Sequence, residues 1–553
     1  MPDAAPTLPG DSAGEFPARV MSSDDIIPGK GYLTDEAIGW LTYLDRKTTF
    51  DDSWFKDDSV HPSWDNMTGA PIGVYHRYDL SYATYALGLM AENTPAWREE
   101  YGKVLGYMAD RFLEYWAMWD WIENSGPDPN RANYPAEAAV LFPPGYMGKY
   151  DIPGWAGNGI EPYQYDPDPV RGNGACNLMY KGYLNLVISF FNYVTGDSKY
   201  DTDFKVAYDK DTVYTYNHRS LNELIANQLR ANITGLGCEV MKIYPWCNNL
   251  TGMASRFYDV MHGTNMSSAY EGWKRWYREN AMSPSYGTEP VDKHALYWDP
   301  TINVEEQGLA FPDATGYVMN GEEHQFAYNW WANAYHLSGL DRELGERVFK
   351  GAKKKFIEFQ KDGSAFSIGL PGLAGDYQYA TICATSAAQE YGDTELFEGL
   401  NLHIQNNYEP TWDAPRGEFF FHLGLGEDWP RGQLNDWLLP AYTATKPGQF
   451  GNMFSNPNTE KFRLPTLVGV DFPTLRVRQA TSDANAFYGA FTSVDRAKLG
   501  EPTSYKVTKL TPGAKYQVAV SGAPVTETNA DAKGEISIKA KIGTHTTIVR
   551  RIG

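Results

Sequence analysis

The stretch NLMYKGYLNLVISFFNYVTGDSKYD, residues 177–201, is a long apolar segment that stops at Gly196 and is followed by polar residues. Glycine readily adopts the left-handed conformation that closes a helix, so this pattern predicts a helix ending at Gly196 with a second helix soon after. The same punctuation recurs in the chain at Gly263, Gly339 and Gly392. We therefore predict a mainly α protein, built as a ring of helical hairpins that form an α/α barrel.

The sequence on either side of this region sets the predicted domain limits. LTDEAIGWLTYLD reads as a helix with Thr34 as its N-cap and Asp45 near its end. After about Leu464, segments such as AKYQVAVSG alternate apolar and polar residues, which is typical of antiparallel strands. We predict three parts: an N-terminal arm over 1–33, a barrel domain over 34–460 and a small β-sandwich over 461–553.

A segment rich in Pro, Gly and aromatic residues, 122–175, interrupts the barrel domain. Long loops inside compact domains are often functional, so we expect it to form a lid or rim at the mouth of a ligand site.

Composition excludes several classes of partner. The formal net charge is -21, with 48 Lys and Arg against 69 Asp and Glu, which disfavours nucleic acid and anionic membrane surfaces. No window approaches the ~20 apolar residues of a membrane span, and no secretory signal is visible. We expect a small-molecule partner and a cytoplasmic protein, or a periplasmic one if a signal has been removed.

Motifs for phosphate binding, for a nucleophilic serine elbow and for a His-Glu-x-x-His zinc site are not found in the sequence. The stretch GCEVMKIYPWCN carries two of the four cysteines, Cys238 and Cys247. Judged by residue type alone, these two cysteines could form a disulfide, bind a metal, pack as two buried thiols or take part in catalysis. Their spacing and the lack of nearby Cys or His ligands disfavour metal, so we predict no metal site.

These two cysteines also carry a resemblance. The stretch GCEVMKIYPWCNNLTGMASRFYDVMHGTN is similar to a segment of the bacterial linalool dehydratase-isomerase family, and MYKGYLNL within the opening stretch is similar to another. LTYLD, with Asp45, and RYDLSYATYAL, with Tyr78, agree more loosely and in the same chain order.

The resemblance implies an (α/α)6 barrel, a homo-oligomer and a cofactor-independent lyase or isomerase. Such an enzyme dehydrates or isomerises a tertiary allylic alcohol, either a terpenoid or a short alkenol. It places the acid/base aspartate at Asp45, the two active-site cysteines at Cys238 and Cys247, and substrate-lining residues at Tyr78, Met179 and Tyr328. We add the aromatics between the cysteines, Tyr244 and Trp246, to the predicted substrate-binding set.

The chain departs from the family at its catalytic histidine, which is Tyr183 here, and at a tyrosine contact that falls near Asp51. We predict that Tyr183 is catalytic, either as a hydrogen-bond donor to the hydroxyl or beside another base, with His76 and His324 as candidates. Two insertions, around 122–174 and near 200–220, also separate the chain from the family pattern.

The predicted chemistry needs an acid near the hydroxyl, a base near the departing proton and a dry apolar cavity. Burial would let Asp45 hold a proton, and two free thiols could hydrogen-bond the hydroxyl or trap the allylic cation.

Two alternatives remain from the sequence. A carbohydrate-active α/α barrel, a glycosidase or lyase, could pair Asp45 with Glu239 or Asp376. A noncatalytic aromatic-lined binding protein is the other.

Overall fold

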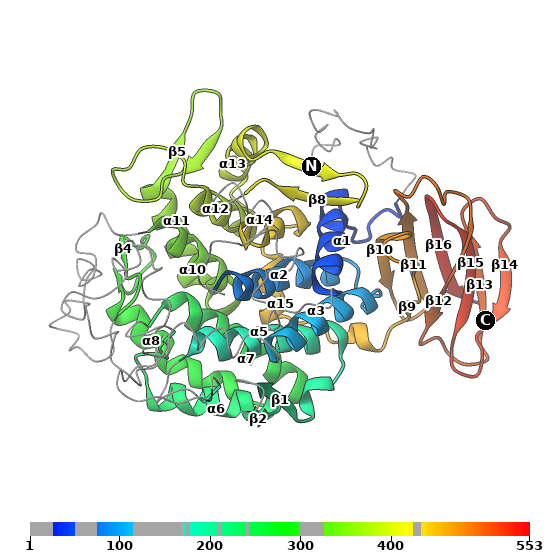
Figure 1. The fold of residues 1–553 in the computed structure, drawn as a ribbon, viewed down its shortest axis with the longest axis horizontal. Coiled ribbons are helices and arrows are strands. Elements are labelled where there is room, and N and C mark those ends of the chain that lie inside the picture. The colour runs from blue at the N-terminus through cyan, green and yellow to red at the C-terminus, as the bar shows by residue number, and fades with distance from the viewer. Residues whose placement is uncertain are drawn as a thin grey trace, which may run out of the picture.

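The computed structural model describes residues 26–49, 74–113, 168, 170–171, 177–207, 213–238, 243–298, 326–423 and 433–552. Over these residues the protein is mainly helical, with sheets in its C-terminal region (Figure 1). Most of the predicted N-terminal arm and most of the insertion 122–175 lie outside the described residues. Among the described helices none has the length and apolar character needed to cross a membrane.

Six helices contact one another in a closed cycle, each touching the next and the last touching the first. In order around the cycle they are α2 (Val74–Asn93), α5 (Leu178–Thr195), α7 (Pro245–His262), α10 (Ala327–Leu340), α12 (Gln378–Tyr391) and α14 (Gln433–Thr443). The side chains of α5 from Leu178 to Val194 are all buried, as expected for a helix that is apolar all round. These six helices form the core of the helical part.

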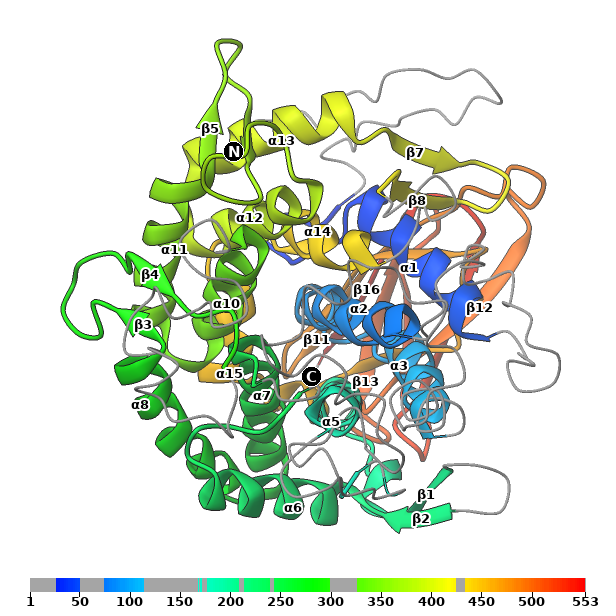
Figure 2. The ribbon, with the colours of Figure 1, turned by 60° about the vertical axis from the view of Figure 1, so that its left-hand side comes forward.

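A second set of helices lies outside this cycle: α1 (Asp35–Thr49), α3 (Glu99–Arg111), α6 (His218–Ala231), α8 (Tyr270–Asn280), α11 (Arg342–Phe356) and α13 (Thr394–Asn407). Figure 2 shows α6, α8, α11 and α13 at the outer edge of the helical part. They are one-sided. In α6 the buried Leu221, Ile225 and Leu229 recur every four residues, so one stripe faces the inner helices.

Short elements fill the connections. Helix α15 (Gln449–Ser455) packs on α10, and single 3-10 turns occur at η7 (Lys199–Asp201), η8 (Met266–Ala269) and η11 (Glu460–Phe462). Within the described ranges, two-stranded pairings join β1 (Phe204–Ala207) with β2 (Val213–Tyr216), β3 (Met282–Ser283) with β4 (Lys293–His294), β5 (Ile357–Phe359) with β6 (Ala365–Ser367), and β7 (Pro410–Asp413) with β8 (Glu418–Phe421).

Helix ends follow the glycine pattern at three of the four predicted positions. Gly196, Gly263 and Gly392 are C-caps in the left-handed conformation, with φ of 73°, 65° and 74°. The prediction for Gly339 is wrong, because α10 continues to Leu340. A Cβ at Gly339 would lie 2.6 Å from the ring of Phe454, so this glycine permits close packing with α15 instead. The predicted N-cap at Thr34 is confirmed by the bond from the Ala37 N–H to its hydroxyl, 3.1 Å.

Two sheets make up the C-terminal region. The larger has the order β10-β11-β16-β13-β14, and the smaller has the order β15-β12-β9. The strands are β9 (Thr466–Val468), β10 (Arg476–Ser482), β11 (Ala486–Thr492), β12 (Pro502–Thr508), β13 (Lys515–Val520), β14 (Thr526–Asn529), β15 (Ile536–Lys541) and β16 (His545–Arg551). The sheets pack on each other where Tyr505 of β12 stacks on Phe491 of β11, with ring centroids 4.6 Å apart.

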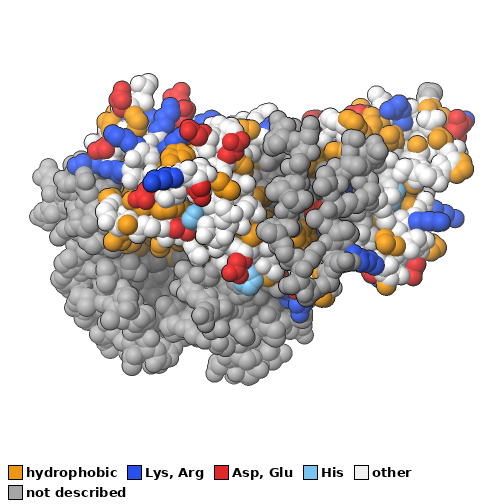
Figure 3. Space-filling view, turned by 90° about the horizontal axis from the view of Figure 1, so that it is seen from above, with side chains coloured by type: hydrophobic (Ala, Val, Ile, Leu, Met, Phe, Trp, Pro, Cys, Tyr) orange, Lys and Arg blue, Asp and Glu red, His pale blue; other side chains and the backbone are white. Residues whose placement is uncertain are grey.

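The sheets lie at one end of the molecule, beside α1 and α3 (Figure 1). Backbone hydrogen bonds join the two parts, from the Leu33 N–H to the Arg478 carbonyl and from the Ala96 N–H to the Ala480 carbonyl. On the face seen in Figure 3, acidic and basic side chains are interspersed over the residues drawn in colour. The described part of this face therefore offers no continuous basic surface.

Candidate active site

The phenol oxygen of Tyr183 is the meeting point of the predicted site. It lies 2.7 Å from the hydroxyl of Tyr82 on α2 and accepts a 3.0 Å hydrogen bond from the indole N–H of Trp246 on α7. The sulfur of Cys247 is 3.9 Å away. All four side chains are buried. Three neighbouring helices of the inner cycle thus bring one polar cluster together.

Local structure explains how Trp246 and Cys247 reach this cluster. Pro245 occupies the first position of α7, where its fixed φ suits a helix start and its missing N–H costs nothing. The next two residues therefore fall in the first turn of the helix, beside the first turns of α5. Gly182 allows this close approach, since a Cβ there would lie 2.7 Å from the Thr251 hydroxyl of α7.

The loop that carries Cys238 is fixed to both helices. The Asn248 side chain accepts from the Leu236 N–H at 3.0 Å and donates to the Leu236 carbonyl at 3.1 Å. The Leu178 N–H at the start of α5 donates to the Gly237 carbonyl at 2.9 Å. These bonds hold Cys238 against the beginning of α7.

Cys238 and Cys247 form a disulfide in the structure, with their Cα atoms 6.5 Å apart. The expectation of two free thiols is therefore wrong for this state of the protein. Its physical reason is the clamp at Asn248, which brings the two Cα atoms within the range that a disulfide spans.

Other predicted residues gather around the pair. The sulfur of Cys238 lies 3.6 Å from that of Met179. Tyr328 meets the Trp246 ring edge-on at a centroid distance of 5.9 Å. Tyr244 is the N-cap of α7 and packs on Tyr297, 5.1 Å between centroids.

Asp45 lies in an ion-pair cluster between α1 and α3. Its carboxylate is 2.7 Å from the Lys103 ammonium, which is also 2.7 Å from Glu100. Burial, together with the negative charge of Asp45, raises the pKa of Glu100 to about 8. One carboxyl of this buried cluster thus holds a proton at neutral pH. The described contacts of Asp45 are to α3, whereas those of Tyr183 are to α2 and α7.

Several predicted residues lie outside the description. The side chains of Tyr78 and His76, on the first turns of α2, are not described, nor are Asp51, Glu239 and His324.

The alternative carboxylate, Asp376, is described and is fully engaged. Its oxygens accept from Thr381 at 2.6 Å and from Tyr408 at 2.7 Å, and lie 3.0 Å from the His403 ring. These bonds tie Asp376 into a structural network around α12 and α13, and they do not favour the carbohydrate-active alternative.

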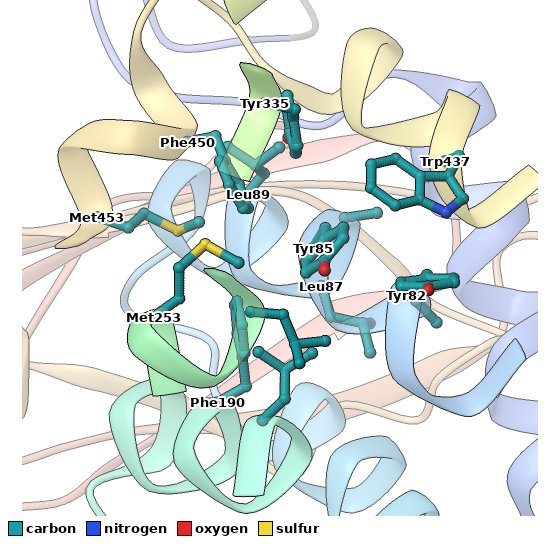
Figure 4. Packing of buried hydrophobic residues seen from close by; sticks show 14 of the residues in the cluster. Tyr82, Tyr85, Leu87, Leu89, Phe190, Met253, Tyr335, Trp437, Phe450 and Met453 are labelled. Carbon is teal, nitrogen blue, oxygen red and sulfur yellow. The ribbon is translucent and has the colours of Figure 1, made fainter. Parts of the chain in front are cut away.

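An aromatic cluster that sequence reasoning missed surrounds Tyr82. Figure 4 shows Tyr82 and Tyr85 of α2 beside Trp437 of α14. The Trp437 ring lies 4.9 Å from that of Tyr82 and 5.8 Å from that of Trp246. Tyr82 is four residues after Tyr78 in RYDLSYATYAL, so helical spacing was the signal that could have identified it.

His336 of α10 was also missed. Its ring nitrogen Nε2 lies 2.8 Å from the Tyr85 hydroxyl, and its ring is 5.4 Å from Trp437. Burial lowers the pKa of His336 to about 3, so this imidazole is neutral beside the aromatic cluster.

Solved structures similar to this chain include two that are distant in sequence. A structure of UGL with dGlcA-Glc-Rha-Glc is 11% identical, covers 74% of this chain and 95% of that chain, and has a TM-score of 0.37. A GH127 beta-L-arabinofuranosidase from Geobacillus stearothermophilus T6 is 10% identical, covers 96% of this chain and 77% of that one, and has a TM-score of 0.29. Similarity at this level does not extend to a shared function.

Comparison with protein families is more specific. A family model matches residues 155–419 of this chain. This region contains Tyr183, both cysteines, Met179 and Tyr328, while Asp45 and Tyr78 precede it. Residues 155–419 match the model of the linalool dehydratase/isomerase family, and the family resemblance predicted from the sequence is thereby confirmed.

Proposed function

We propose that this chain is a cofactor-independent dehydratase/isomerase that acts on a tertiary allylic alcohol, terpenoid or short alkenol. The observation that carries the proposal is the Tyr183 hydroxyl, which lies among Tyr82, Trp246 and Cys247 inside the region that matches the linalool dehydratase/isomerase family. A buried polar cluster with aromatic walls suits a substrate that has one hydroxyl and an otherwise apolar body.

The proposal extends to the architecture. We take the closed cycle of six helices and the outer set as an (α/α)6 barrel, with residues 34–460 as the catalytic domain and 461–553 as a β-sandwich. We also propose that the protein forms a homo-oligomer.

In the proposed reaction, a proton is transferred to the substrate hydroxyl, the C–O bond breaks and water leaves. The resulting allylic cation loses a proton from a neighbouring carbon to give a diene, or water adds at the other end of the allylic system and releases a proton to give the isomer. The faces of Tyr82, Trp246 and Trp437 can stabilise this cation by cation–π attraction.

Tyr183 is placed to bind the hydroxyl. Its oxygen already accepts the Trp246 N–H, and accepting one hydrogen bond strengthens a phenol as a donor. Its O–H can therefore be offered either to Tyr82 or to a substrate oxygen. This role replaces proton abstraction by the family histidine, for which an ordinary phenol is poorly suited.

Asp45 is the proposed acid/base group. Glu100 shares the Lys103 ammonium with it and holds a proton at neutral pH, so the pair has one proton to exchange. The proton of Glu100 can pass to Asp45, which then delivers it to the substrate hydroxyl.

The cysteines can act in this chemistry only when reduced. A disulfide sulfur carries no proton to donate, whereas a thiol can hydrogen-bond the hydroxyl and a thiolate can trap the cation. The disulfide form seen here is therefore the inactive form in this proposal.

The test is a headspace gas-chromatography screen of purified, reduced protein against tertiary alkenols of increasing chain length. We expect the parent to form dienes or isomeric alcohols, and Asp45→Asn and Cys238→Ala to form at least tenfold less. Parent protein without turnover of any alkenol, or variants as active as the parent, would reject the proposal.

A further inference from the structure

Three metal-ligating side chains converge where α5, α6 and α7 meet, outside the candidate active site. Asp201 ends η7, His218 begins α6 and His262 ends α7. One oxygen of Asp201 and one ring nitrogen of each histidine all lie within 4.8 Å of one another. Oδ1 of Asp201 is 2.9 Å from Nε2 of His262 and 3.7 Å from Nδ1 of His218.

The tautomer of His262 leaves a lone pair facing this centre. Nδ1 of His262 lies 2.9 Å from the carbonyl oxygen of Tyr258, which can only accept, so Nδ1 carries the hydrogen. In the neutral ring, Nε2 is then an acceptor, and it faces a carboxylate oxygen that is also an acceptor. A positive charge here, carried by a second ring hydrogen or by a bound cation, resolves this conflict.

His218 supplies an independent observation. Its side chain is only 1% exposed, and its Nδ1 has no hydrogen-bond partner among the described residues. Its other nitrogen, Nε2, lies 3.0 Å from the Ser189 hydroxyl, whose own hydrogen can go to Asn185. With Nε2 as donor to Ser189, the lone pair of Nδ1 points toward Asp201. A buried acceptor left unpaired destabilises the folded protein.

We propose that Asp201, His218 and His262 bind one divalent transition-metal cation, with Zn²⁺ the best suited. Tetrahedral zinc with bonds of about 2.0–2.1 Å places its ligand atoms about 3.3 Å apart. The two distances from the Asp201 oxygen, 2.9 and 3.7 Å, lie on either side of this value. The Tyr258 carbonyl and Ser189 hydroxyl orient the two rings, as outer partners do in zinc sites.

The site is accessible to an ion from solvent. The Asp201 side chain is 33% exposed and that of His262 is 20% exposed, so a fourth position can be filled by water. The ring of Tyr258 packs against both histidines, with centroids 4.1 Å from His262 and 4.7 Å from His218. This packing fixes the rings before an ion arrives.

A Ser–His–Asp hydrolase is a competing interpretation of the same residues, because Ser189, His218 and Asp201 are connected in that order. Ser189 is completely buried within α5. No ester or amide carbon could reach its hydroxyl, so the arrangement does not support nucleophilic catalysis.

The position of the site indicates what the cation does. Cys247 and His262 are at opposite ends of α7, about 22 Å apart at 1.5 Å per residue. The cation therefore lies away from Tyr183 and joins the turn after α5 to the start of α6 and the end of α7. Asp201 and His218 fall in the insertion near 200–220, so this stabilising site is a property of this chain beyond its family pattern.

The test uses the full chain without a histidine tag, stripped of metal by chelator and titrated with ZnCl2 by calorimetry. We expect one site per chain in the parent, and at least tenfold weaker binding in His262→Ala and in Asp201→Asn. Both positions are partly exposed, and circular dichroism checks that both variants fold. The parent should also show a Zn²⁺-dependent rise in Tm that His262→Ala lacks, because an ion that binds only the folded state stabilises it.

His403→Ala is the matched control. His403 and Asp376 form another histidine–carboxylate pair, 3.0 Å apart. Among the described residues, no third His, Cys, Asp or Glu joins this pair in a possible metal-binding group. This variant should bind Zn²⁺ as the parent does. The proposal is overturned if the parent binds Zn²⁺ no more tightly than His262→Ala, or if His403→Ala loses binding to the same extent. Co²⁺ in place of Zn²⁺ gives a second readout, since visible bands of tetrahedral cobalt should appear in the parent and be absent from His262→Ala.

Discussion

The indole N–H of Trp246 donates a 3.0 Å hydrogen bond to the phenol oxygen of Tyr183, and both side chains are buried. This bond uses one lone pair of the phenol, whose O–H can be donated to Tyr82 or to a ligand. The residue at the position that the resemblance gives to the family histidine is thus held by a tryptophan on a neighbouring helix. The chemistry of the site is therefore expected to depend on the hydroxyl of Tyr183 more than on its ring.

Tyr183→Phe should lower kcat for alkenol turnover by about 10²–10³, the usual contribution of one positioned hydrogen-bond donor. It should also reduce the free energy of unfolding by about 1–3 kcal/mol, since Trp246 and Tyr82 lose a buried partner. Tyr183→His, which restores the family residue, should keep measurable turnover. Initial rates by gas chromatography and urea unfolding separate the two effects.

Tyr200→Phe is the control for loss of a buried tyrosine hydroxyl. The Tyr200 hydroxyl lies 3.0 Å from the Gly106 carbonyl and 2.9 Å from an Asp110 oxygen, both on α3, and has no described contact with Tyr183. It should cost similar stability without a loss of kcat. Equal losses of kcat in both variants would show that Tyr183 acts only through stability.

The disulfide predicts a specific thiol pattern. Unreduced, denatured protein should yield the segments containing Cys238 and Cys247 as one cross-linked species by mass spectrometry, with Cys383 alkylated. Closing a loop with a sequence separation of 9 corresponds to about 2–3 kcal/mol in the chain-entropy model, so reduction should lower the free energy of unfolding by about that amount.

Reduction should at the same time start alkenol turnover, because the reduced thiols carry protons and the disulfide sulfurs do not. A Cys238→Ser/Cys247→Ser variant should be insensitive to reductant in both measurements. Full alkylation of both cysteines without prior reduction would contradict the pairing.

The sequence was informative where structure is decided locally. Helix ends at Gly196, Gly263 and Gly392 depend on the conformational freedom of one residue, and all three were predictable. Gly339 was misread because its role is to approach Phe454, which lies far along the chain. Contact with a distant segment leaves no local signal.

The same distinction applies to the sites. Order along the chain, read through the family resemblance, was enough to group Tyr183 with Cys238 and Cys247. The cluster of Asp201, His218 and His262 spans 61 residues and no short motif, so only the packing of α5, α6 and α7 reveals it. The proton on Glu100 depends on burial between α1 and α3, which its sequence neighbours do not indicate.

The free energy of unfolding should decrease as pH rises, because Glu100 has a raised pKa in the folded protein. Its folded-state pKa of about 8 exceeds the ordinary value of 4.5, so between these values the unfolded chain releases a proton that the folded protein keeps. The stabilisation is complete below the ordinary value and is lost as pH rises through about 8. Glu100→Gln should therefore be more stable than the parent at pH 9 by about 4 kcal/mol relative to their difference at pH 5.

Urea unfolding at the two pH values measures this effect. Glu346→Gln is the control, because Glu346 is a half-exposed residue of α11 paired only with Lys350, at 2.7 Å, among the described ion pairs. It should leave the pH dependence of stability unchanged. An unchanged pH dependence in Glu100→Gln would show that Glu100 is ionised in the folded protein.

Gly182 and Gly106 form a matched pair that tests how closely α5 and α7 must pack. A Cβ at Gly182 would lie 2.7 Å from the Thr251 hydroxyl, which is held by its bond to the Cys247 carbonyl, so Gly182→Ala must push α7 away from Tyr183. We expect a loss of about 1–3 kcal/mol and lower turnover. At Gly106 the nearest atom, in the ring of Phe191, would be at an ordinary 3.5 Å, so Gly106→Ala should gain about 0.5–1 kcal/mol from helix propensity alone. Urea unfolding of both variants, with alkenol turnover beside it, decides the matter: equal stabilisation of both would mean that the contact between α5 and α7 at the candidate site is loose.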